Sequence, residues 1–145
     1  MARTVELDRL KALKDTVSVV GVGESSYLQD YRAGAKGNAT EKGSGAMNSY
    51  QLAATALKRA LDDAGLTKDD IDGFVTASGS PGGVDYDEFT AHTGLQIRWT
   101  NQFWAHGRWG SSSLVNAAMA IQNGLANYVL VALACWQGFH RPELS

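Results

Sequence analysis

Short apolar runs alternate with helical patterns along the chain, and this alternation restricts the possible folds more than any other feature of the sequence. Four runs have sequence patterns of strands, at residues 17–23, 71–77, 97–104 and 127–134. Three segments between them predict helices, at residues 49–65, 84–94 and 110–124. Because parallel strands need helical crossovers, the alternation predicts an α/β fold with a layered α-β-α arrangement and a mostly parallel sheet.

The clearest helical pattern lies at residues 49–65, where small and apolar side chains recur at three- and four-residue steps and form one stripe. Asn48 or Ser49 can cap the start of this helix, and Gly65 can cap its end. Residues 110–124 begin with a glycine and three serines and continue with small apolar side chains. That composition predicts a helix buried nearly all round.

Two of the predicted strands differ in their exposure patterns. Residues 127–134 are almost continuously apolar, which predicts a strand covered on both faces of a parallel sheet. Residues 97–104 alternate large apolar and polar side chains, which predicts a strand that is polar on one side and lies at an edge or an interface.

Length and charge exclude several classes of protein. The 145 residues leave room for one domain. A formal net charge of -2 argues against nucleic-acid binding, which needs a basic face. No apolar run approaches the roughly 18–20 residues that span a membrane, and residues 1–15 lack the apolar core of a secretion signal. Cys135 is the single cysteine, so no internal disulfide can form and a cytoplasmic location is predicted.

Several short motifs carry little weight. Gly21-x-Gly23-x-x-Ser26 follows a predicted strand, as a dinucleotide fingerprint does, but a glycine-rich stretch follows it instead of a helix. A tight turn is the better interpretation, and a nucleotide-binding module is kept as a third hypothesis. No Gly-x-Ser-x-Gly elbow is present. No metal site is predicted, because no paired ligand spacing connects His92, His106, Cys135 and His140.

The segment between the third predicted strand and the last predicted helix, residues 105–113, is the strongest candidate site. Backbone N–H groups at the helix start would form a positive pocket for a thioester oxygen or a phosphate. Gly107 and Gly110 would let the backbone approach a ligand closely. The alternative is that Ser111 caps the helix and the glycines only permit the turn. Both interpretations stay open at this point.

Two blocks of the sequence resemble thiolases. Residues 50–74 resemble the first helix and second strand of that family, and residues 110–131 resemble its nucleophile-bearing helix and the following strand. With the opening Val20-Gly21-Val22-Gly23-Glu24-Ser25, the chain is most similar to the sterol-carrier or lipid-transfer thiolase-like branch. The resemblance covers about residues 17–133 and only the first part of such a protein.

The resemblance implies a domain organisation. Residues 1–16 would be an N-terminal extension, and residues 17–145 would be the N-terminal portion of a thiolase-like domain, with a mobile glycine-rich loop at 27–48. The C-terminal half of the fold, which in thiolases supplies the catalytic histidine and a second cysteine, would lie outside this chain. We therefore expect the chain to be part of a longer protein or to need a partner.

The resemblance also implies a reaction. Gly107 stands where thiolases carry their nucleophilic cysteine, so the chain is not expected to be a cysteine-dependent thiolase. Similar proteins with glycine there are aldolases of steroid side-chain degradation, which cleave a β-hydroxyacyl-CoA without a covalent acyl intermediate. The implied substrate-binding residues are His106, Gly107, Arg108, Gly110 and Ser111. Coenzyme A enters as part of the substrate, no separate cofactor is expected, and no general base is assigned.

Alternatives and partners complete the expectations. The chain could instead be a non-catalytic acyl-CoA- or lipid-binding subunit of a complex, or a relative of acetyl-CoA acyltransferases. In similar thiolases the third strand pairs with its twofold mate, which implies a homodimer with Trp99, Phe103 and Trp104 near the interface. The alternative is that these aromatic residues fill the core. A small zinc-ribbon/OB-fold subunit is a further implied partner.

Overall fold

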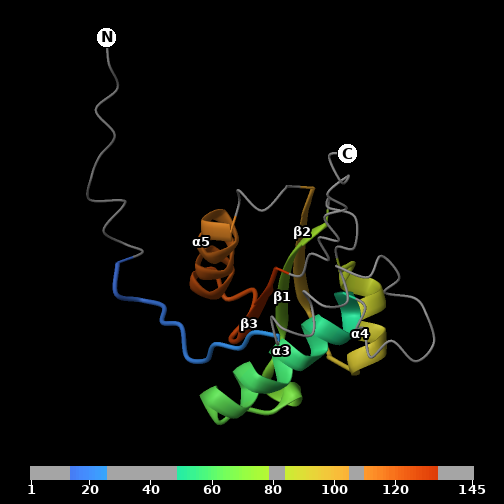
Figure 1. Ribbon diagram of the computed structural model, residues 1–145. Helices are drawn as coiled ribbons and strands as arrows, with labels where there is room; N and C mark the ends of the chain where they lie inside the picture. Colours follow the sequence, from blue (N-terminus) through green and yellow to red (C-terminus); the bar gives the residue numbers. More distant parts are fainter. Residues whose placement is uncertain (1–13, 26–48, 79–83, 105–109, 134–145) are drawn as a thin grey trace, which may run out of the picture.

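A parallel sheet between helices forms the centre of the molecule (Figure 1). The computed structural model describes residues 14–25, 49–78, 84–104 and 110–133. Its elements, in chain order, are α3 (Ser49–Ala64), the 3-10 turn η2 (Lys68–Asp70), β1 (Gly73–Ser78), α4 (Tyr86–Thr93), β2 (Trp99–Trp104), α5 (Gly110–Gln122) and β3 (Val129–Ala132). The predicted loop at residues 27–48 lies outside the described residues. The described helices match the predicted helices, and β1, β2 and β3 match three of the four predicted strands.

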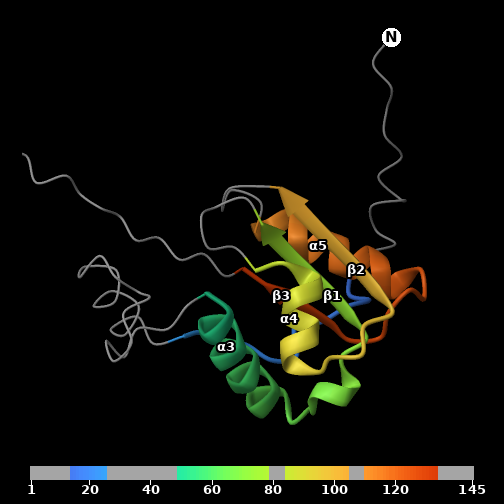
Figure 2. The same cartoon turned by 90° about the vertical axis from the view of Figure 1, so that its right-hand side faces the viewer.

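The sheet order is β2-β1-β3, and both pairings are parallel. Gly73 at the start of β1 lies opposite Trp99 of β2 and Val129 of β3. Helix α5 covers one face of the sheet, and α3 and α4 cover the other (Figures 1 and 2). The structure therefore confirms the predicted α/β fold with a layered arrangement and a parallel sheet.

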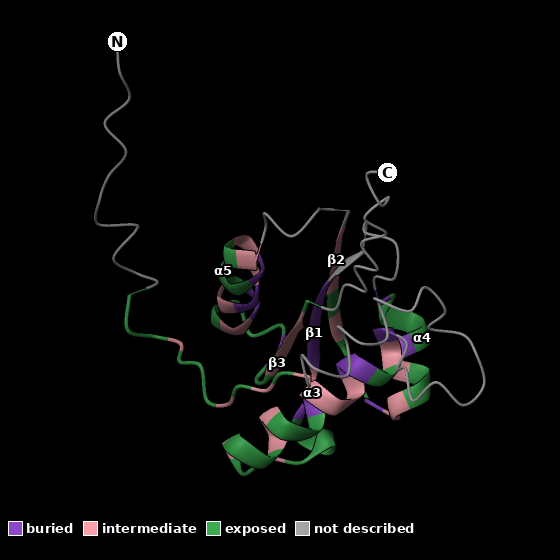
Figure 3. Cartoon of the chain, viewed as in Figure 1, coloured by how far each residue is buried: buried purple, intermediate pink, exposed green. Residues whose placement is uncertain are grey.

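The main core lies between the sheet and the α3–α4 layer. Phe74 of β1 and Phe89 of α4 are 0% and 1% exposed, and their ring centroids are 5.5 Å apart. Five further buried side chains complete this cluster: Ala53, Leu57, Ile71, Val84 and Leu95. Figure 3 shows the buried residues along β1 and on the inward sides of the helices. The stripe predicted for residues 49–65 supplies this packing, because Ala53 and Leu57 belong to it.

The prediction of a buried strand at residues 17–23 is wrong. The segment forms no strand, and three of its four valines are exposed, with Val19 69% and Val22 70% exposed. The segment lies along α3 instead. The two backbones are so close that a Cβ added at Gly23 would be 2.0 Å from the carbonyl oxygen of Ala56. The N–H of Val22 also donates to Oδ2 of Asp63 at 2.9 Å. Glycine at this point therefore serves close packing against a helix, which supports a packing role for the Gly21-x-Gly23 motif.

The prediction that the helix at residues 110–124 is buried nearly all round is also wrong. Small side chains of α5 pack toward the sheet, and Ser113 and Ala120 are 0% and 2% exposed. Large apolar side chains point outward, with Leu114 and Val115 each 52% exposed. The small residues allow close approach to the sheet, but they cover only one side of the helix.

Strand β3 is likewise less covered than predicted. It is half-buried along its length, and it ends at Ala132. The reason is its position at an edge of the described sheet, where only β1 pairs with it. The predicted edge position of β2 is confirmed within the same described sheet.

One carboxylate joins the amino ends of all three strands. Oδ1 of Asp72 accepts the N–H groups of Asn127 and Tyr128 at 2.7 and 2.9 Å. Its Oδ2 accepts a hydrogen bond from Nδ2 of Asn127 and pairs with Nε of Arg98, both at 3.0 Å. Burial raises the pKa of Asp72, but the N–H donors of Tyr128 and Asn127 and the charge of Arg98 outweigh it, so the pKa lies below its usual value. The sequence analysis did not identify this link.

Candidate functional site

The starts of the three helices gather at the carboxyl end of the sheet. The hydroxyl of Thr76, near the end of β1, donates to the carbonyl of Val84 just before α4, at 2.9 Å. A Cβ at Gly110, the first residue of α5, would lie 3.2 Å from Cδ1 of Leu133, which follows β3. Parallel α/β sheets bind ligands at this end, where helix N-termini favour negative charge. The carboxyl end is therefore the candidate site.

The start of α4 is already occupied by protein groups. Oε1 of Gln102 accepts the N–H of Tyr86 at 2.9 Å, and Nε2 of the same side chain donates to Oδ1 of Asp85 at 2.8 Å. Tyr50 of α3 donates its hydroxyl to Oε2 of Glu88 and accepts the N–H of Asp85 at 3.3 Å. Burial and the hydrogen bond to Glu88 raise the pKa of Tyr50, so its phenol stays protonated as a donor. This network caps α4 and joins it to α3 and β2.

The start of α5 is the part of the predicted site that the structure describes. Gly110 is half-buried beside Leu133, and Ser111 is exposed. Like every helix start, this turn carries backbone N–H groups that have no partner within the helix. His106, Gly107 and Arg108 lie outside the described residues. In the chain they stand between Trp104, where β2 ends, and Gly110, where α5 begins.

A chain of amide groups connects β2 to the first turn of α5. Nδ2 of Asn101 donates to Oδ1 of Asn116 at 3.2 Å, and Nδ2 of Asn116 donates to the carbonyl of Ser112 at 2.8 Å. Both asparagines are half-buried. This link was not predicted from the sequence. The signal that could have found it is an asparagine between Trp99 and Phe103, on the side of β2 that otherwise carries aromatic residues.

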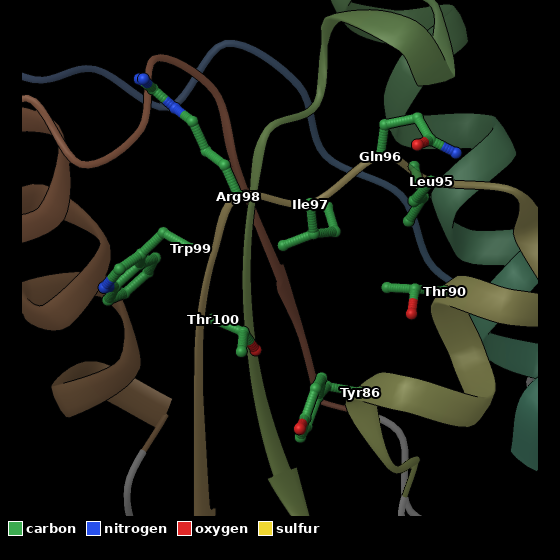
Figure 4. A pocket seen from close by; sticks show the side chains of 8 residues that line it. All are labelled: Tyr86, Thr90, Leu95, Gln96, Ile97, Arg98, Trp99 and Thr100. Carbon is green, nitrogen blue, oxygen red and sulfur yellow. The ribbon is translucent and has the colours of Figure 1, made fainter.

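A separate open groove of about 260 Å³ lies at the amino end of β2, next to α4 (Figure 4). Its lining is Tyr86, Thr90, Leu95, Gln96, Ile97, Arg98, Trp99 and Thr100. Of the residues predicted for a site or an interface, it contains Trp99. The groove was not predicted from the sequence, and it lies at the end of β2 opposite to the candidate site.

The aromatic residues assigned to a dimer interface are only partly described. In Figure 4 the side chain of Trp99 extends toward α5, and Tyr86 lies on the α4 side of β2. Cε3 of Trp99 would be 3.4 Å from a Cβ at Gly73, so the indole packs over β1. Phe103 is half-buried, and the side chain of Trp104 lies outside the described part of the chain. Trp99 is half-buried, and a homodimer with these aromatic residues near its interface stays a prediction.

Among the described residues, no group of three His, Cys, Asp or Glu side chains could hold a metal ion. His92 is exposed on α4, with Nδ1 2.7 Å from the carbonyl of Glu88. No helix within the described ranges is long and apolar enough to cross a membrane.

No protein-family model matches the sequence, and no curated protein sequence matches it. A chain of the solved structure "Ltp2-ChsH2(DUF35) aldolase" has a similar fold, with a TM-score of 0.65 and 23% sequence identity. The similarity covers 84% of this chain and 28% of that chain, so the present chain spans less than a third of its length. At this identity the comparison establishes a shared fold.

Proposed function

We propose that this chain is the N-terminal part of a thiolase-like lyase that cleaves a carbon–carbon bond of a β-hydroxyacyl-CoA by a retro-aldol reaction. The observation that carries the proposal is the similarity, over 84% of the chain, to the fold of a structure named an aldolase. Gly107 adds to it, because this residue replaces the expected nucleophilic cysteine between the end of β2 and the start of α5. A thiol-independent cleavage fits both features.

The proposed reaction needs no covalent intermediate. A general base removes the proton of the β-hydroxyl group, the oxygen forms a carbonyl with the β-carbon, and the bond between the α- and β-carbons breaks. Its electron pair moves onto the thioester as an enolate. Protonation at the α-carbon then releases a shortened acyl-CoA beside the ketone or aldehyde. We assign no general base to this chain and place that group in the second half of the fold.

Stabilising the enolate is the role we assign to this chain. Backbone N–H groups at the start of α5, around Gly110 and Ser111, would donate to the thioester oxygen as negative charge develops there. His106, Gly107 and Arg108 would line the same pocket. Glycine at position 107 leaves room for a branched acyl group, and a steroid side chain is the substrate that we place first.

The proposal includes partners. We place the protein in the cytoplasm, as a homodimer that pairs through β2, with a small zinc-ribbon/OB-fold subunit. The edge position of β2 in the described sheet supports the pairing. The name of the structural neighbour joins two components, which supports a second subunit. The alternative is an acyl-CoA- or lipid-binding subunit of a complex without turnover.

The test uses the natural full-length protein together with its partner subunit. Steroid and aromatic β-hydroxyacyl-CoA thioesters are incubated with it, and the shortened acyl-CoA and the carbonyl product are detected by mass spectrometry. Gly107→Trp fills the proposed pocket and is expected to abolish cleavage. Leu125→Trp is the matched control, because Leu125 is 48% exposed beyond the end of α5. Full activity of Gly107→Trp would refute the pocket, and thioester binding without cleavage by the wild type would favour the non-catalytic alternative.

A further inference from the structure

The amide pair Asn101–Asn116 is half-buried between β2 and α5, beside apolar side chains of the sheet. Asn101 is the third residue of β2 and lies opposite Val75 of β1, which is 0% exposed. On the other side of Val75, β3 places Val131. A half-buried amide loses part of its hydrogen bonding to water, and the Oδ1 of Asn116 accepts from Nδ2 of Asn101 at 3.2 Å in its place.

Stability alone does not explain the pair. Replacing both partners of a buried hydrogen bond by apolar groups of similar shape is often nearly neutral, whereas removing one partner is costly. What a polar pair adds beside apolar side chains is a defined register, because the two groups bond in one relative position only. Here the register is that of α5 over β2.

The link reaches the first turn of α5. Asn116 accepts from Asn101 with its oxygen and donates with its nitrogen to the carbonyl of Ser112, two residues after the first residue of the helix. The pair therefore fixes the middle of β2 against the middle of α5, and the contact of Asn116 with Ser112 extends this link to the first turn of the helix. These are the two elements that flank Gly107 in the chain.

We propose that Asn101 and Asn116 are positioning residues, which hold the N–H groups at the start of α5 in place for the thioester oxygen. This inference rests on the proposed function. Neither side chain touches substrate: Asn116 acts through the Ser112 carbonyl, and Asn101 acts through Asn116. The first turn of α5 would thus be positioned by its link to the sheet.

The test compares the double variant Asn101→Val/Asn116→Leu with the wild type, in the full-length protein with its partner subunit. Because both partners become apolar, the melting temperature is expected to stay close to the wild-type value. A displaced α5 start is expected to lower kcat for β-hydroxyacyl-CoA cleavage about tenfold or more, with KM changed less than about twofold. The N–H resonances of Ser111 and Ser112 are expected to shift in the nuclear magnetic resonance spectrum.

Asn123→Leu is the matched control. Nδ2 of Asn123 donates to the carbonyl of Met119 at 2.7 Å, the same four-residue contact that Asn116 makes, but at the other end of α5. This variant is expected to change neither kcat nor the two resonances. If the double variant keeps the wild-type kcat, or keeps both resonances unshifted, the positioning role is wrong. If the wild type does not cleave any thioester, the proposed function fails, and the resonances still decide whether the pair positions the turn.

Discussion

Replacing Asp72 by asparagine should destabilise the fold at neutral pH, and the size of the effect can be worked out from the four contacts of the carboxylate. The shape of the side chain is kept, so one oxygen can still accept the N–H groups of Asn127 and Tyr128. The other oxygen becomes an NH₂ group, which then faces two donors, Nδ2 of Asn127 and Nε of Arg98. Two favourable contacts become repulsive, and the charge is lost.

Hydrogen bonds to charged groups are worth about 1.5–3 kcal/mol each, and such contributions do not add fully when they share one group. The side chain of Asp72 is 20% exposed, so solvent screens it only in part. We therefore expect Asp72→Asn to lower the free energy of unfolding by about 2–3 kcal/mol. For a chain of this size the melting temperature should fall by roughly 6–10 °C.

The effect should depend on pH with a defined sign. The folded-state pKa of Asp72 is lowered, so its stabilisation is complete above the unfolded-state pKa, near about 4, and is lost as the pH falls through the lower folded-state pKa. The difference between wild type and Asp72→Asn should be largest at pH 7 and should shrink below about pH 4.

Thermal unfolding followed by circular dichroism at pH 7 and at pH 3 measures both expectations. Asp69→Asn is the control, because the carboxylate of Asp69 is 77% exposed and lies 3.4 Å from Nζ of Lys68. This control should change the free energy of unfolding by less than about 0.5 kcal/mol at either pH. An equal loss of stability in Asp72→Asn at both pH values would show that the charge of Asp72 does not carry the effect.

Two further substitutions test the packing. Gly23→Ala should lower the free energy of unfolding by about 1–3 kcal/mol, since the added Cβ would lie 2.0 Å from the carbonyl oxygen of Ala56. Urea unfolding measures this loss, and an unchanged midpoint would contradict the close packing. Thr76→Val should cost about 1–2 kcal/mol, because the buried hydroxyl donates to the carbonyl of Val84 at 2.9 Å. Thr55→Val is its control, an exposed hydroxyl within α3 that should lose little, and equal losses in both variants would disprove the role of burial.

Local periodicity was sufficient to predict the helices and the sheet strands. The stripe containing Ala53 and Leu57 has the spacing of one helix face, and that face is buried. The same reasoning failed at residues 17–23, because a β-branched run looks alike whether it enters a sheet or lies along a helix. What decides the outcome there is the fit of Gly21 and Gly23 against the backbone of α3, a contact between segments more than thirty residues apart.

The site shows a second limit of sequence reasoning. Gly107 is identified only through a family resemblance, whereas the topology places Gly110 at the carboxyl end of the sheet from strand order alone. Asn101 and Asn116 are fifteen residues apart, on a strand and on a helix, and no periodic pattern connects them. Their pairing depends on the parallel register that sets Asn101 opposite Val75 and on the rotation of α5 that turns Asn116 toward β2. A polar residue beside apolar side chains is visible in a sequence only after the inward side of its strand is known, so positioning contacts of this kind follow from the fold.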